Sequence, residues 1–120
     1  MSDVNMIFGA KREGGNDSEG IQLIQNGYLG GENSDSVTFD VIDHQMYLLF
    51  TREITISSGA LRGYRAIQIA RTENDSFSRQ NLAASTNAGV TITNNTTNGT
   101  ITLTPNATTY DVYYALYAIM

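Results

Sequence analysis

The sequence has no cysteine and no tryptophan, and it has only one proline and one histidine among its 120 residues. Without cysteine the chain cannot form disulfide bonds, cysteine-ligated zinc or iron–sulfur sites, or a thiol nucleophile. A domain of this length buries roughly two thirds of the surface of its unfolded chain, so it can fold without such cross-links. We therefore expect a single domain over residues 1–120, without a cofactor, in which residues 1–20 form an extended or poorly ordered N-terminal segment.

Positive charge is also scarce. Seven lysine and arginine residues stand against twelve aspartate and glutamate residues, which gives a formal net charge of −5. The basic residues form no run longer than two. Because binding to a phosphate backbone needs clustered lysine and arginine, this composition excludes nucleic acid as a partner.

Long apolar stretches are missing as well. The longest mostly apolar stretch, YYALYAIM at the C-terminus, is far shorter than the roughly 20 residues that cross a bilayer. The N-terminal sequence MSDVNMIFGAKREGG lacks the apolar region of a signal peptide. We expect neither membrane insertion nor export by the general secretory route.

Helical periodicity is nearly absent, whereas strand alternation recurs along the chain. Val37, Phe39 and Val41 alternate with polar residues, and Ile67 and Ile69 share one face of the segment YRAIQIA, which we expect to be the core side. About seven or eight such strands, separated by Gly, Asn and Asp, predict an all-β fold. We expect a jelly-roll-like antiparallel β-sandwich, and an immunoglobulin-like sandwich is the alternative.

The segment 85–109 consists largely of Thr and Asn, a composition that is also typical of low-complexity linkers. However, apolar residues alternate in GVTIT and in GTITLT, and Asn98-Gly99 lies between these two runs. This pattern predicts a β-hairpin. Before it, we expect the segment SRQNLAAST (78–86) to form no more than a turn, with a short, weaker strand around Phe77.

Residues 110–120 are predicted to form the last strand, and this strand is apolar on both faces. One face carries Tyr110, Val112, Tyr114, Leu116, Ala118 and Met120, and the other carries Asp111, Tyr113, Ala115, Tyr117 and Ile119. Because only one face of a strand can point into a sandwich core, the other face needs a second cover.

Two covers are possible for the second face of this strand, a loop of the same chain or a neighbouring subunit. Tyrosine suits subunit interfaces because it combines an apolar ring with a polar hydroxyl, and the two-sided apolar pattern recurs in 45–50. We therefore predict a homo-oligomer, with a trimer placing these strands around a threefold axis. The predicted interface residues are Tyr110, Tyr113, Ala115, Tyr117 and Ile119.

Candidate catalytic and metal-binding groups form no specific pattern. Adjacent Asp43 and His44 would point to opposite faces of an extended strand, and Ser57 and Ser58 lie in no G-x-S-x-G motif. Two acidic groups lack the spacing of a calcium loop, although calcium in one of them stays an alternative. These groups are Glu32, Asp35, Asp40 and Asp43, and Asn16, Asp17 and Glu19. We expect no catalytic residue and no metal site.

A carbohydrate-binding module is a second class of function compatible with the sequence. Exposed aromatic rings stack on sugar faces in such modules, while loop Asn and Asp side chains bond the hydroxyls. The candidate stacking residues are Tyr28, Tyr64 and Phe77. A small hydrolase is a third class, which would need a cleft that joins two carboxylates, or a serine with His44.

The order of segments from about residue 36 onward resembles the C-terminal β-sandwich domains of bacteriophage tail and head-fibre proteins. The resemblance is carried by QMYLLFT, YRAIQIA, GVTITN, the Asn-Gly turn, GTITLT and YDVYYALYAIM. It implies a homotrimer with jelly-roll-like sheets and a structural or host-attachment role in a virion, in contact with other virion proteins or host surface glycans. Before assembly the protein would be cytoplasmic. The resemblance implies no ligand residues.

Overall fold

The protein is described by a computed structural model, which places residues 20–41, 45–72 and 76–119. These residues form eight strands and one 3-10 helix. The elements are β1 (Ile21–Leu29), η1 (Gly31–Asn33), β2 (Val37–Asp40), β3 (Met46–Thr55), β4 (Leu61–Arg71), β5 (Phe77–Ala84), β6 (Val90–Asn95), β7 (Thr100–Pro105) and β8 (Tyr110–Ile119). The predicted N-terminal segment lies almost entirely outside the described residues.

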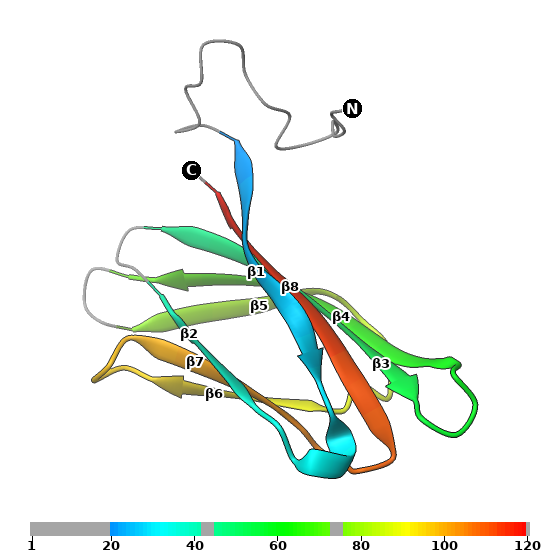
Figure 1. Ribbon diagram of the computed structural model, residues 1–120. Helices are drawn as coiled ribbons and strands as arrows, with labels where there is room; N and C mark the ends of the chain where they lie inside the picture. The colour runs from blue at the N-terminus through cyan, green and yellow to red at the C-terminus, as the bar shows by residue number, and fades with distance from the viewer. Residues whose placement is uncertain (1–19, 42–44, 73–75, 120) are drawn as a thin grey trace.

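The strands build two antiparallel sheets, one of five strands in the order β1-β8-β3-β4-β5 and one of three in the order β2-β7-β6. Figure 1 shows β1 lying along β8, so that the start of β1 and the end of β8 meet at one end of the molecule. The first strand therefore pairs with the last and the second with the seventh, as in a chain wound into a jelly roll. The expected all-β, jelly-roll-like sandwich is confirmed.

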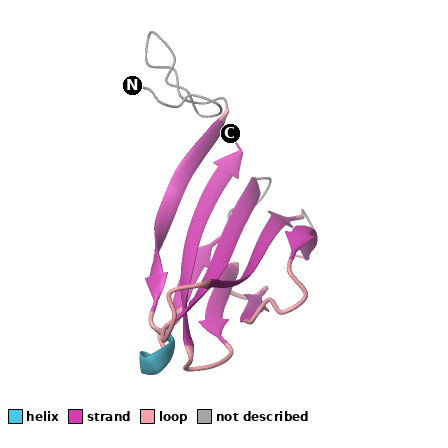
Figure 2. Ribbon diagram, turned by 90° about the vertical axis from the view of Figure 1, so that its right-hand side faces the viewer, coloured by secondary structure: helices cyan, strands magenta, loops and turns pink. Residues whose placement is uncertain are grey.

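The core lies between the two sheets, whose layered arrangement is visible in the turned view of Figure 2. Ile67 and Ile69 on β4 are buried there, as the alternation predicted, and they share this interior with Leu49 on β3 and with Ile101 and Leu103 on β7. The centre of each inner face is thus mainly apolar and buried. Thr51 and Glu53 are the buried polar side chains among the described residues.

The Thr- and Asn-rich segment forms the predicted hairpin. β6 and β7 pair antiparallel from Val90–Pro105 to Asn95–Thr100, and the connecting turn contains Asn98-Gly99. Gly99 has a φ of +67°, a conformation that glycine adopts without the clash that a Cβ would cause. Val41 also donates its backbone N–H to the Gly99 carbonyl, at 2.8 Å.

The expectation of a mere turn over residues 78–86 is wrong, because most of this segment belongs to β5. This strand forms the edge of the five-stranded sheet and pairs with β4. All of its residues except Phe77 are exposed, so burial imposes no apolar alternation on it. The segment is a strand because its backbone N–H and C=O groups pair with those of the long β4, and this pairing leaves no pattern in the side chains.

Arginine side chains link the two sheets along the side where β4 and β5 face β6. Arg65 donates to the Val90 carbonyl at 3.0 Å, and Arg79 donates to the Ile92 carbonyl at 3.0 Å. Arg71 donates to the carbonyl of Thr96 at 3.3 Å. These arginines are therefore occupied in holding the sandwich together.

Candidate functional site

The outer face of the five-stranded sheet is the main surface feature of the structure. On β8, every second residue from Tyr110 to Ala118 is buried, and the residues between them are half-buried. The predicted division of this strand into two apolar faces is therefore correct. Large apolar side chains of the same sheet expose 39% to 58% of their surface, so no part of the described chain covers this outer face.

Four of the five predicted interface residues, Tyr113, Ala115, Tyr117 and Ile119, lie on the outer face. Tyr110 does not, because it belongs to the alternating set that points into the core, where it is 2% exposed. Its hydroxyl donates to the Gly89 carbonyl at 2.6 Å. Tyr110 is thus an internal anchor of β8, and its assignment to an interface has to be withdrawn.

At one end of the outer face, the side chains on β1, β8 and β3 are apolar apart from a tyrosine hydroxyl. Two rows of cross-strand partners run over β1, β8 and β3 there, because residues that face each other in an antiparallel sheet point to the same side. We call these six residues the apolar end: Ile21, Ile119 and Met46 in one row, and Leu23, Tyr117 and Leu48 in the next. Leu23 is 46% exposed and Met46 39%.

The part contributed by β1 was not foreseen, and the reason is a β-bulge. The register of β1 against β8 shifts between Leu23 and Gln25. An extra residue reverses the side to which the following residues point, so Ile21 and Leu23 face outward while Leu29, which has the same parity in the sequence, is buried. The bulge cannot be read from the alternation alone.

Further along the sheet, one row combines aromatic rings with a cation. Tyr28 on β1, Tyr113 on β8, Arg52 on β3 and Tyr64 on β4 are successive cross-strand partners. The rings of Tyr28 and Tyr113 are stacked with their centroids 5.4 Å apart, and the Arg52 guanidinium carbon lies 4.6 Å from the Tyr113 centroid. We call these four residues the aromatic row.

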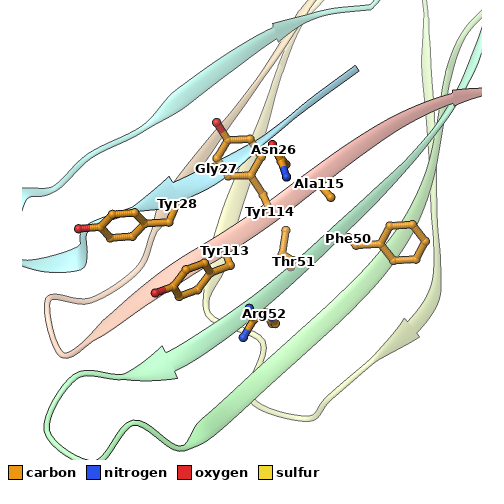
Figure 3. A pocket seen from close by; sticks show the side chains of 9 residues that line it. All are labelled: Asn26, Gly27, Tyr28, Phe50, Thr51, Arg52, Tyr113, Tyr114 and Ala115. Atoms are coloured by element: carbon orange, nitrogen blue, oxygen red, sulfur yellow. The ribbon is translucent and has the colours of Figure 1, made fainter. Parts of the chain in front are cut away.

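A hollow of about 490 Å³ adjoins the aromatic row. Figure 3 shows Tyr28, Tyr113 and Arg52 along one side of it, Phe50 on the other, and Ala115 between them. Asn26 adds an amide from β1. In the next row of the sheet, Ala115 lies between Asn26 and Phe50. Because the Ala115 side chain is a single methyl group, it leaves a space between the larger side chains around it.

The three candidate sugar-stacking residues are divided by the structure. Tyr28 and Tyr64 belong to the same aromatic row and are 56% and 46% exposed. Phe77 lies at the start of β5, where it is partly buried and packs against the core. The pair Tyr28 and Tyr64 was identified from the sequence, but Arg52, Asn26 and Phe50 were not, because their proximity depends on the register of β1, β8 and β3.

The candidate catalytic and metal-binding residues are dispersed or lie outside the described residues. Asn16, Asp17, Glu19, Asp43 and His44 belong to the segments that the structure does not describe. Ser57 and Ser58 are in the turn after β3. Asp35 accepts a hydrogen bond from the Gly30 N–H at 3.0 Å. Within residues 20–41, 45–72 and 76–119, no three carboxylate or imidazole groups gather in a way that could hold a metal ion, and no helix is long and apolar enough to span a membrane.

Comparisons with protein-family models, with curated proteins and with solved structures found no match to this chain.

Proposed function

We propose that this chain is a non-enzymatic structural protein that assembles with copies of itself through one end of the outer face of its five-stranded sheet. The observation that carries the proposal is the apolar end, where six outward side chains from three adjacent strands form one continuous surface. Exposed apolar patches of this kind are typical of interfaces between protein subunits, because burying them removes apolar surface from water.

The composition of the outer face supports permanent association. Isoleucine, leucine, methionine and tyrosine make up the apolar end, and subunit interfaces that stay closed are enriched in such residues and poor in charge at their centre. The apolar end contains no charged residue. A threefold arrangement around β8 is the stoichiometry that we propose, in keeping with the resemblance to fibre domains.

The setting that we propose is a virion, in which the oligomer serves as a structural or host-attachment component. The resemblance of residues 36–120 to bacteriophage fibre domains supports this setting. Labelling of phage particles with an antibody against the chain tests it: labelled tails or heads support a virion role, and particles without label contradict it.

Size-exclusion chromatography with light scattering tests the assembly. We expect a multiple of the 13.1 kDa chain mass, three times that mass for a trimer. We expect dissociation to a monomer when Tyr117→Glu places a charge in the apolar end. Thr93→Glu is the matched control, because Thr93 is exposed on β6, in the other sheet. A wild-type chain that stays monomeric at micromolar concentrations would contradict the proposal.

A further inference from the structure

We infer that the hollow beside the aromatic row is a binding site for an acidic sugar residue, with Arg52 as the group that engages its carboxylate. The site lies one to two rows away from the apolar end along the same strands. The inference does not depend on self-assembly, and it concerns a ligand rather than a second copy of the chain.

Arg52 differs from the other arginines of the described residues. Arg62, Arg65, Arg71 and Arg79 each donate a hydrogen bond to an oxygen of the protein itself. Within the same part of the chain, Arg52 contacts the ring of Tyr113 but donates to no protein oxygen and pairs with no carboxylate. Its N–H groups are therefore free to bind an external acceptor.

The aromatic row holds this guanidinium in place before any ligand arrives. The Tyr113 ring stacks on Tyr28 and also makes a cation–π contact with the Arg52 guanidinium. In such a contact the cation is attracted by the electrons of the ring. A planar guanidinium fixed in this way presents its donors as a fork that matches a carboxylate with two parallel hydrogen bonds.

The other groups around the hollow suit a hydroxylated ring. The Asn26 amide can donate and accept hydrogen bonds, while Ala115 and Phe50 offer an apolar surface to the C–H groups of a sugar. The volume of about 490 Å³ lies within the range of small-molecule sites. A sugar that carries a carboxylate can pair with the Arg52 cation, form hydrogen bonds through its hydroxyls and pack its C–H groups against the apolar side of the hollow.

An acidic peptide fits this location less well. Peptides bind to sheets chiefly by adding a strand at a free edge, where backbone groups are unpaired. The hollow instead lies on the face of the sheet, above β1, β8 and β3, and it is lined by side chains rather than by the unpaired edge of β1. A ligand there has to be recognised through side chains, as sugars are.

NMR titration of the isotopically labelled full chain tests the inference, with 3′-sialyllactose as the acidic probe and lactose as its neutral counterpart. We expect saturable shifts at Asn26, Tyr28, Arg52 and Tyr113 with sialyllactose, and at least tenfold weaker binding of lactose. Arg52→Gln should weaken sialyllactose binding at least tenfold. Arg79→Gln, which removes the same charge from β5, should leave it unchanged.

Several outcomes would overturn the inference. These are the absence of shifts at millimolar sialyllactose, equal binding of lactose, equal loss in the Arg52→Gln and Arg79→Gln variants, and shifts caused equally well by a glutamate-rich peptide. Burial of Arg52 between subunits, seen as protection of its side chain from dicarbonyl modification at concentrations where the oligomer forms, would also overturn it. Self-assembly itself is judged separately, by molar mass, so the two proposals can fail independently.

Discussion

Arg62 donates to the carboxylate of Glu53 at 2.7 Å, and this carboxylate is completely buried. The arginine extends from β4 to β3, and its guanidinium carbon also lies 4.4 Å from the ring centroid of Tyr110 on β8. The pair thus joins three neighbouring strands on the inner side of the sheet. Because Glu53 follows Arg52 directly, the same contact fixes the part of β3 that carries the aromatic row.

Removing the arginine should be costly. Arg62→Ala leaves the buried carboxylate without its cation, and we expect a loss of about 3 kcal/mol in the free energy of unfolding, at the low end for a broken buried pair because the Arg62 side chain is 35% exposed. Urea denaturation measures this loss. Arg79→Ala, at an exposed arginine of β5, serves as the control and should cost about 1 kcal/mol or less. Equal losses in the two variants would show that the ion pair has no special role.

The stacked tyrosines should be energetically coupled across β1 and β8. A double-mutant cycle with Tyr28→Ala and Tyr113→Ala is expected to give a coupling energy of about 0.5–1.5 kcal/mol, the range for paired aromatic rings. Tyr28 and Tyr64 stand at opposite ends of the aromatic row and share no ring contact, so the same cycle on that pair should give a coupling close to zero. A larger coupling for Tyr28 with Tyr64 than with Tyr113 would contradict the stacking.

The turn between β6 and β7 should tolerate asparagine better than alanine at position 99. Gly99→Ala forces a side chain into a positive φ, which costs roughly 1–2 kcal/mol. Asparagine adopts this conformation more readily than alanine, and both variants introduce the same Cβ beside Arg71. Thermal or urea unfolding of the two variants should therefore rank Gly99→Asn as the more stable, and the reverse order would show that the larger asparagine side chain, rather than the positive φ, decides their relative stability.

The sequence predicted the elements of the fold better than their arrangement. Alternation identified the buried set on β4 and divided β8 into its two faces, and Asn98-Gly99 identified the hairpin, because side-chain direction and turn geometry are local properties. The neighbours of each strand depend on contacts between distant segments. That Tyr28 lies opposite Tyr113, 85 positions later, cannot be derived from either segment alone, and neither can the bulge after Leu23, which reverses the side to which the rest of β1 points. The residues of the candidate site therefore could not be grouped until the register of β1, β8 and β3 was known.

Self-assembly through the apolar end should make thermal stability depend on protein concentration. When subunits dissociate as they unfold, mass action favours the folded oligomer at higher concentration. For a trimer of this chain length, a tenfold increase in concentration should raise the melting temperature by about 3–5 °C. Tyr117→Glu should abolish this dependence because it charges the apolar end without touching the core, whereas Thr93→Glu on β6 should preserve it. Calorimetry over a hundredfold range of concentration decides the matter: a constant wild-type melting temperature means that the chain unfolds as a monomer and that the outer face is not an interface between its copies.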